Sequence, residues 1–358
     1  MRILQVAPGS CEIGRGGLPE HIRNISERLA KRHDVTIFAT NRKGMLPRYE
    51  LSNGVKIERF KRYAPSGAYF FSLEMILRMR KAKFDIVHAH CYHAFPMHFS
   101  WLAKHRKLVV STHFHGAAHS PFREPLFRLF KPFGKKILEA ADNIIAVSEF
   151  EKSLLCRYFG LQQRKIFVIP NGVSLSEFAG LKRHERGFKS ILYVGRLESY
   201  KGAQYLVDVL PKLDDNVVLE IVGEGPMRKA LENRAKQLDV HNRVLFSQNL
   251  SRRELLQKYF DTDVFVLLSR HEAYCLAVAE ALAAGTPCIV TNTSALSEWI
   301  DNQSCFGVGF PISLRELASS IRNIFDGAVN RKAMKKWLGT KILEWDEVVR
   351  RLEEIYAR

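Results

Sequence analysis

The chain has 358 residues, of which 46% are hydrophobic and 26% are charged, as in globular proteins rather than disordered or fibrous ones. This length suits two domains, each large enough to bury its own core. No apolar run approaches the roughly 18 residues that a membrane-spanning helix needs, and the N-terminal run that stops at Pro8 is too short for a signal peptide. The six cysteines form no CxxC pair, so we expect reduced thiols and a cytoplasmic location.

The net charge of +18 is distributed unevenly along the chain. Residues 1–180 contain 29 Lys and Arg against 14 Asp and Glu, whereas the remainder contains 26 against 23. The basic half indicates a polyanionic partner, such as nucleic acid, an anionic membrane surface or a phosphorylated substrate. A general enrichment of lysine and arginine in the source proteome is the alternative.

Short β-branched runs alternate with amphipathic stretches in the first half. The predicted buried strands are residues 2–6, 35–39, 86–89, 108–111, 144–147 and 166–169, and helical periodicity covers 19–32 and 135–141. Strands that are apolar almost throughout and alternate with helices predict a parallel sheet covered on both faces.

The second half repeats this plan, with predicted strands at residues 191–194, 218–222, 244–246, 264–268 and 288–290. A charged stretch without periodicity, 180–187, separates the two series. We therefore predict an α/β fold with two doubly wound Rossmann-like domains, residues 1–178 and 188–336, and a C-terminal helical segment, residues 337–358. Ligands of such folds bind beyond the carboxyl ends of the strands, so we expect the site in the cleft between the domains.

The most informative segment, residues 269–287, directly follows the predicted strand 264–268. Residues 277–284 favour a helix, which Gly285 caps and Pro287 keeps from continuing. Glu272 then lies in the strand-to-helix turn and Glu280 lies about two turns into the helix.

The start of this helix is a candidate anion site. The free N–H groups near Cys275, Leu276 and Ala277 can bind a diphosphate. One glutamate, such as Glu280, can then accept hydrogen bonds from ribose hydroxyls while Glu272 faces a sugar. Solvated helix charges are the alternative interpretation of two glutamates at this spacing.

Two further turns follow predicted strands of the second half. Arg196 and Lys201 come after the strand 191–194, where two cations suit a diphosphate. Gly223 follows the strand 218–222, and a glycine there lets the backbone approach a ligand. Three suitable turns after strands of one domain favour a nucleoside-diphosphate site more than any of them does alone.

Further short motifs occur through the whole chain: Gly16-Gly17-Leu18-Pro19-Glu20, Val147-Ser148-Glu149, Ile169-Pro170-Asn171-Gly172-Val173, Val194-Gly195-Arg196 with Lys201-Gly202, Val222-Gly223-Glu224-Gly225, and Glu272 with Glu280. In this order and spacing they resemble the retaining family 4 glycosyltransferases of the GT-B fold. The resemblance implies two Rossmann-like domains that face a central cleft. It places the acceptor on the N-terminal domain and the nucleotide sugar on the C-terminal domain, and it returns the C-terminal helix to the N-terminal domain.

The resemblance also implies roles for residues on the donor side. Arg196 and Lys201 would contact the donor diphosphate. Glu280 would bind the ribose, and Glu272 would face the transferred sugar. These cations replace a divalent metal, so we expect no metal and no cofactor beyond the nucleotide-sugar substrate.

The resemblance assigns residues of the first half as well. Gly16 and Gly17 would bring their backbone close to the diphosphate from the opposite domain. His113, at the carboxyl end of the strand 108–111, corresponds to a family histidine near the reacting sugar, with His115 as the reserve candidate. The implied reaction transfers a hexose to an acceptor hydroxyl with retention of the anomeric configuration.

Two segments depart from the family pattern. The family usually has a glycine-aromatic-glycine stretch where this chain has Ala273-Tyr274-Cys275, and Asn302-Gln303-Ser304-Cys305-Phe306-Gly307 differs from its usual glycine-rich turn. Side chains in place of these glycines would narrow the sugar subsite, which leaves the identity of the donor open.

Ten of the thirteen histidines precede residue 120. The pairs His88/His90 and His113/His115 have same-face spacing on strands, but no carboxylate or cysteine accompanies them at usual metal-ligand spacing. We therefore expect no metal site at these pairs.

The acceptor side contains two aromatic, basic stretches, residues 69–81 and 122–136. They fit a surface that touches anionic lipid headgroups, or core helices whose cations reach out to solvent, and both interpretations stay open. The first predicts a lipid-linked acceptor at the inner membrane face, and the second predicts a glycan. No nucleic acid is expected as a partner. A nucleotide-sugar epimerase of the same fold and a non-catalytic basic binding protein are the alternative functions.

Overall fold

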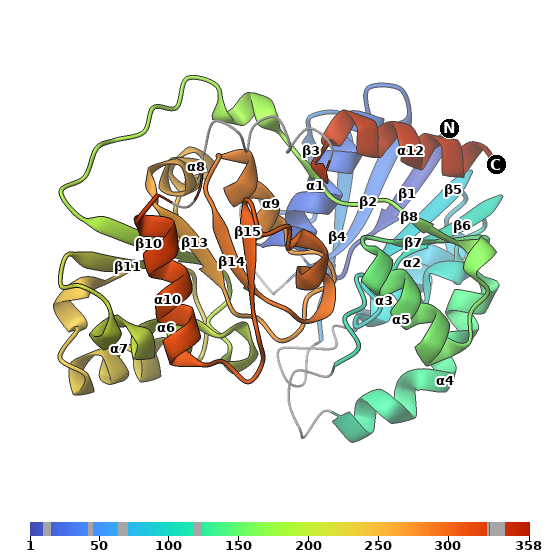
Figure 1. Cartoon of the computed structure of the whole chain (residues 1–358). Coiled ribbons are helices and arrows are strands. Elements are labelled where there is room, and N and C mark those ends of the chain that lie inside the picture. The colour runs from blue at the N-terminus through green and yellow to red at the C-terminus, as the bar shows by residue number, and fades with distance from the viewer. Residues whose placement is uncertain (10–15, 42–45, 64–70, 118–123, 328, 330–340) are drawn as a thin grey trace. The chain divides into compact units, whose positions relative to one another are not determined.

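The computed structural model describes residues 1–9, 16–41, 46–63, 71–117, 124–327, 329 and 341–358. The chain forms two compact units: unit 1 comprises Met1–Gly172 and Trp345–Arg358, and unit 2 comprises Val173–Glu344. Each unit is a mostly parallel sheet with helices on both faces, as Figure 1 shows. None of the described helices combines the length and the apolar character needed to cross a bilayer.

Unit 1 contains an eight-stranded sheet of order β3-β4-β2-β1-β5-β6-β7-β8. Its elements are β1 (Arg2–Val6), α1 (Gly17–Leu29), β2 (Asp34–Asn41), β3 (Tyr49–Ser52), β4 (Val55–Lys61), α2 (Leu73–Lys81), β5 (Ile86–His90), α3 (Phe95–His98), β6 (Lys107–Ser111), α4 (Glu124–Ala140), β7 (Asn143–Ala146), α5 (Glu149–Phe159), β8 (Ile166–Val168) and α12 (Trp345–Ala357). Helices α1 and α12 pack together on one face of this sheet, and α3, α4 and α5 lie on the other (Figure 1).

The strands of unit 1 are hydrophobic because both faces of the sheet are covered. In β1, Ile3, Leu4 and Val6 are completely buried, as is the polar side chain of Gln5. Ile3 is in register with Ile86 of β5, which places β1 at the centre of the sheet.

One edge of this sheet differs from the prediction of a wholly parallel arrangement. Strands β3 and β4 pair antiparallel, and neither strand was predicted. Asn53 and Gly54, with φ of 48° and 80°, form the two-residue turn between them. Asn-Gly is the preferred sequence of such hairpin turns, so this pair was the signal that could have identified the hairpin.

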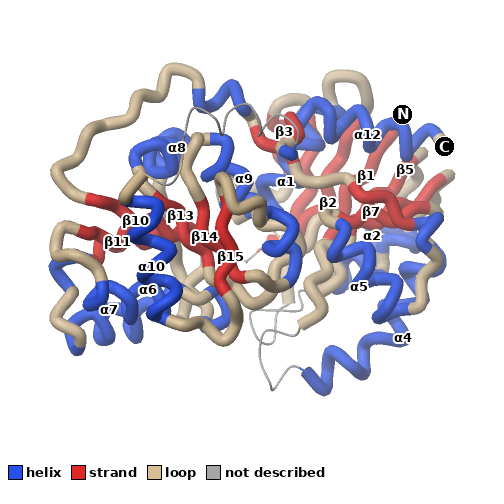
Figure 2. Tube along the Cα trace, viewed as in Figure 1, coloured by secondary structure: helices blue, strands red, loops and turns tan. Residues whose placement is uncertain are grey.

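Unit 2 contains a six-stranded parallel sheet of order β12-β11-β10-β13-β14-β15, drawn with its flanking helices in Figure 2. Its elements are β10 (Lys189–Val194), α6 (Ala203–Val209), β11 (Val217–Val222), α7 (Arg228–Gln237), β12 (Val244–Ser247), α8 (Arg252–Asp261), β13 (Val264–Leu267), α9 (Leu276–Ala283), β14 (Cys288–Thr291), β15 (Cys305–Val308) and α10 (Leu314–Phe325). A short two-stranded sheet of β9 (Gly172–Val173) and β16 (Leu343–Glu344) lies where the chain passes from one unit to the other.

Both sheets reverse their strand order at one point. In unit 1 the reversal lies between β1 and β5, and in unit 2 between β10 and β13. At such a point the connections that follow neighbouring strands leave toward opposite faces, so the carboxyl ends of these strands border a natural ligand crevice. The strand order therefore directs attention to the turns after β1, β5, β10 and β13.

The prediction of two doubly wound units is confirmed, and every predicted strand is present to within two residues at either end. Strand β15 was not predicted. Unit 1 ends at Gly172 rather than at 178, because the segment after it belongs to unit 2, where Glu177 pairs with Arg252 of α8 at 2.8 Å. The predicted boundary at 336–337 lies outside the described residues.

The last helix, α12, belongs to unit 1. Arg28 of α1 contacts Asp346 at 3.0 Å, and His33 contacts Glu353 at 2.9 Å. Trp345 is 2% exposed and is among the largest buried side chains of the unit. The apolar face of α12 thus completes the core beside α1.

Candidate donor site

The reversal point of unit 2 brings a lysine and a glutamate together. Lys201 lies in the turn after β10, and Glu272 lies in the turn after β13. Lys201 Nζ donates a hydrogen bond to Glu272 Oε1 at 2.6 Å, and the two side chains are 15% and 12% exposed. Two residues that are 71 positions apart therefore form a largely buried ion pair where a ligand is expected.

The electrostatics of this pair keep the lysine charged. Burial lowers the pKa of Lys201, but the charge of Glu272 opposes that effect and the pKa lies above its usual value. Lys201 is therefore a fixed cation at the ends of the two central strands. Such a cation suits an anionic ligand without needing a metal ion.

Arg196 lies in the same turn as Lys201 but points its guanidinium toward solvent. Its side chain is 64% exposed. Nη2 donates to the hydroxyl of Tyr200 at 2.6 Å, and the hydroxyl of Tyr193 donates to the Arg196 carbonyl at 2.8 Å. The two tyrosines hold the backbone and the head of this arginine while leaving it accessible to a ligand.

Gly223 and Gly225, which follow β11, lie directly against the backbone of the turn after β10. Gly223 has φ of 150°, and a Cβ at this position would lie 1.9 Å from the carbonyl oxygen of Gly195. A Cβ on Gly225 would lie 2.4 Å from the carbonyl oxygen of Leu197. From the sequence we expected a glycine at position 223 because a ligand approaches the backbone there. The structure shows instead that the turn after β10 occupies the space that a side chain at position 223 would need.

The helix N-terminus after β13 begins with a strained residue. Cys275 precedes α9 with φ of 80°, where glycine would be comfortable. Burial raises the pKa of its thiol, and the N–H groups of Ala277 and Val278 act in the opposite direction. The Ala277 N–H, predicted to bind a diphosphate, therefore faces the sulfur of Cys275, together with the Val278 N–H. Cys275 stands where the family pattern usually has glycine.

Glu280, predicted to bind ribose, lies on α9 and is 4% exposed. Nη1 of Arg252 on α8 donates to Glu280 Oε1, and Nε of the same arginine donates to Glu177 at 2.9 Å. Sequence reasoning missed Arg252. A signal for its helix was present, because Ser251 and Glu254 form a capping box that starts α8 just before this arginine.

In unit 1, Gly16 and Gly17 lie at the start of α1. Gly16 precedes the helix with φ of 104°, and among the described residues no atom beyond its chain neighbours lies within 4 Å of the position of its missing Cβ. The backbone N–H groups of Gly17 and Leu18 in the first turn have no intrahelical acceptor, and Pro19 has no N–H. The described residues thus leave space for a ligand beside Gly16, at the reversal point of unit 1.

His113 follows β6 in a strained backbone, with φ of 47°. A buried carboxylate that the sequence did not reveal holds this loop. Glu151 Oε1 accepts hydrogen bonds from the Thr112 hydroxyl and from the Phe114 N–H, and Oε2 accepts from the Val147 N–H at 2.7 Å. Burial raises the pKa of Glu151 to about 7 despite these hydrogen bonds.

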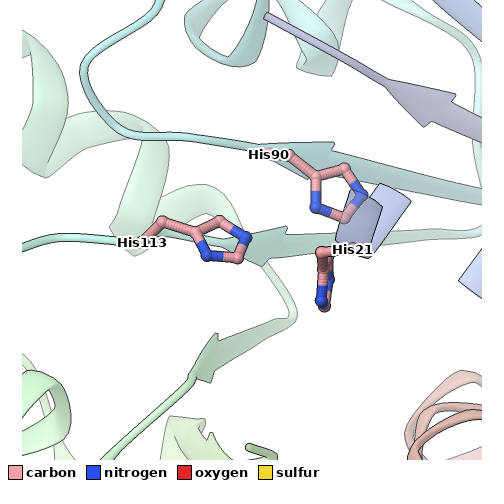
Figure 3. Close-up of side chains that lie close together, drawn as sticks. All are labelled: His21, His90 and His113. Carbon is pink, nitrogen blue, oxygen red and sulfur yellow. The ribbon is translucent and has the colours of Figure 1, made fainter. Parts of the chain in front are cut away.

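Three histidines meet beside this loop, as Figure 3 shows. The ring centroids of His21 and His113 are 5.0 Å apart, and that of His90 lies 5.6 Å from His21. The sequence considered the pairs His88/His90 and His113/His115. The structure instead stacks His115 on His93 at 4.6 Å and adds His21, which the sequence had not singled out.

These units and turns define a class: two-domain, doubly wound α/β proteins whose charged residues gather at the carboxyl ends of parallel strands. The chain matches the family described as Glycosyltransferase Family 4 over residues 15–177 and the family described as Glycosyl transferases group 1 over residues 180–337. It therefore belongs to the family 4 glycosyltransferases of the GT-B fold.

Relatives and solved structures agree with this assignment. The chain is 29% identical to an uncharacterized glycosyltransferase of Methanocaldococcus jannaschii over 80% of each protein. The structure of sucrose-phosphate synthase from Thermosynechococcus elongatus matches with a TM-score of 0.82 and 20% identity, over 99% of this chain and 98% of that one. Anabaena HepE in complex with UDP-glucose matches with a TM-score of 0.79 and 16% identity, over 100% of this chain and 99% of that one.

Proposed function

We propose that this glycosyltransferase moves a hexose from a nucleoside-diphosphate sugar to an acceptor hydroxyl, with retention of configuration and without a metal ion. The observation that carries the proposal is the buried Lys201–Glu272 pair at the reversal point of unit 2. A fixed cation beside a carboxylate suits a ligand that presents a diphosphate and sugar hydroxyls together. The UDP-glucose complex of HepE, a protein of the same fold, supports this choice of donor class.

Each residue has a chemical task in this proposal. The bond between the anomeric carbon and the diphosphate oxygen breaks, and the electron pair leaves with the diphosphate. Arg196 and Lys201 stabilise the negative charge that develops there. Glu272 accepts hydrogen bonds from the sugar, and Glu280 accepts them from the ribose.

Unit 1 completes the reaction in this proposal. Gly16 and Gly17 offer backbone N–H groups to the diphosphate. His113 contacts the reacting sugar. The acceptor oxygen bonds to the anomeric carbon on the face that the diphosphate leaves, and a phosphate oxygen takes the acceptor proton. This chemistry differs from that of glycosidases, which use a pair of carboxylates.

The nature of the acceptor is proposed from the surface of unit 1. Helix α2 buries Met75 and Met79, while Leu73 and Leu77 on the same helix are 54% and 51% exposed. The described part of α4 exposes Phe133 to 68%, with the exposed Lys136 one turn further on. Exposed apolar side chains next to cations favour a lipid-linked acceptor at an anionic membrane surface over a soluble glycan.

The test is an assay of nucleoside-diphosphate release from a panel of nucleotide sugars, read together with thermal protection by each donor. We expect slow release from one donor and an increase in the melting temperature with the same donor. Lys201→Met and Glu272→Gln should lose both effects. Lys229→Met, at an exposed lysine of the same unit, is the matched control and should keep both. The proposal would be refuted if no donor in the panel gave either diphosphate release or thermal protection.

The products also distinguish the alternative functions. A nucleotide-sugar epimerase would convert the free donor into its epimer in the absence of an acceptor.

Co-sedimentation with vesicles that contain anionic lipid tests whether the protein binds a membrane surface. Binding that is lost in Phe133→Ser supports a lipid-linked acceptor, whereas no binding at low salt favours a soluble glycan.

A further inference from the structure

The proposed transfer uses His113 but gives no role to His21 and His90, which form a cluster with it in unit 1. His21 lies on α1, His90 is the last residue of β5, and His113 follows β6, so all three gather beside the reversal point of the sheet (Figure 3). One ring nitrogen from each histidine lies within 4.8 Å of the others. His21 is 3% exposed and His90 is fully buried, whereas His113 is partly exposed.

Two nitrogens of this cluster lack a partner within the described residues. Nδ1 of His90 and Nε2 of His113 are buried without a hydrogen bond to a described residue, and Asn171 is the polar partner beside the two buried nitrogens of His21. The Asn171 side chain lies beside His21 and favours its charged form, but burial dominates and lowers the pKa of His21 to about 4. Buried polar atoms in native proteins nearly always have a partner, so this group of nitrogens indicates a bound ion or water.

The hydrogen bond of His90 selects its tautomer. Nε2 of His90 lies 2.7 Å from Oε1 of Gln5, a completely buried side chain of β1. Because an amide oxygen only accepts, Nε2 carries the proton and Nδ1 presents its lone pair to the cluster. A second partner that orients a histidine in this way is typical of histidines that bind metals.

We propose that His21, His90 and His113 form a binding site for a divalent transition metal such as Zn²⁺, with water or hydroxide as the fourth ligand. Zn–N bonds of about 2.1 Å in a tetrahedral site place the nitrogens roughly 3.4 Å apart. The nitrogens now lie within 4.8 Å of one another, so small side-chain rotations would bring them to that separation. Three neutral imidazoles favour Zn²⁺, Co²⁺, Ni²⁺ or Cu²⁺ over Mg²⁺ and Ca²⁺, which prefer oxygen ligands.

This site has a consequence for activity. A metal bound to Nε2 of His113 fixes the imidazole that the proposed transfer needs beside the sugar, so the ion inhibits transfer. Binding itself does not depend on the proposed function, whereas the inhibition rests on it. The two can therefore be tested separately.

The binding test is a titration of the purified full chain with Co²⁺, read from the visible absorption bands of four-coordinate cobalt. We expect one Co²⁺ per chain, displaced by Zn²⁺. His21→Gln and His90→Gln should each abolish the bands. Gln5→Leu, which removes only the partner of His90, should weaken binding by roughly 10- to 100-fold. Circular dichroism of each variant establishes that it is folded.

His241→Ala is the matched control, because its side chain is 57% exposed and lies in unit 2. This variant should bind Co²⁺ like the parent chain. Absence of four-coordinate bands in the parent, or bands that the His21 and His90 variants keep, would overturn the site. A site confirmed in this way, with transfer unaffected at saturating Zn²⁺, would overturn the inhibition alone.

Discussion

Replacing Gly223 by alanine tests whether the turns after β10 and β11 are fitted to each other as tightly as the structure indicates. The new Cβ would lie 1.9 Å from the carbonyl oxygen of Gly195, and the nearest atom is backbone rather than a flexible side chain. Non-bonded carbon and oxygen atoms rarely approach closer than about 3 Å, so the two turns must separate by about 1 Å.

Two effects contribute to the expected loss of stability. Holding a non-glycine residue at φ of 150° costs about 1–3 kcal/mol. Displacing two packed turns adds about 1–3 kcal/mol, as overpacking of a core does. We therefore expect Gly223→Ala to destabilise unit 2 by about 4 kcal/mol, which lowers its melting temperature by roughly 10 °C for a unit of this size.

The assay is scanning calorimetry, with Gly285→Ala as the matched control. Gly285 also has a positive φ, of 75°, but beyond its chain neighbours no atom of the described residues lies within 4 Å of the position of its missing Cβ. That variant carries only the backbone strain, about 1 kcal/mol. Equal melting temperatures for the two variants would refute the claim that backbone of the neighbouring turn fills the space beside Gly223. Weaker donor protection in Gly223→Ala, at temperatures where it is folded, is expected because Arg196 and Lys201 belong to the displaced turn.

Three further predictions concern buried charges. Because burial raises the pKa of Glu151 from 4.5 to about 7, the folded chain holds a proton that the unfolded chain releases. The contribution of Glu151 to stability should thus be full below pH 4.5 and decline by about 3 kcal/mol as the pH rises to 7. Urea unfolding at several pH values should show this slope in the parent chain and not in Glu151→Gln; parallel curves would contradict it. For Lys201 and Glu272, a double-mutant cycle of Lys201→Met and Glu272→Gln should give a coupling of about 1–3 kcal/mol, with the double variant more stable than the sum of the single losses implies. Arg252→Leu removes the cation that compensates the buried Glu280 carboxylate, so we expect a loss of about 3 kcal/mol in urea unfolding that a second change, Glu280→Gln, largely restores; no restoration would contradict the pairing.

The sequence by itself determined the two-unit plan and the central strands of both sheets, but not β3, β4 or β15. A buried parallel strand such as β1 or β13 must be apolar on both faces, and the helix between two such strands must be amphipathic, so local composition records both. The hairpin of β3 and β4 was also within reach, because Asn53-Gly54 is a local turn signal. The same local reasoning located Lys201 and Glu272 at the ends of strands.

Only the tertiary structure decided which of these side chains meet. Lys201 pairs with Glu272 because β10 and β13 are neighbours in a sheet whose order is not the order of the chain. His21 joins His90 and His113 for the same reason, since α1 returns beside the strand that lies next to β1. Residue spacing along the chain carries no record of strand order, which depends on how the whole sheet closes over its core.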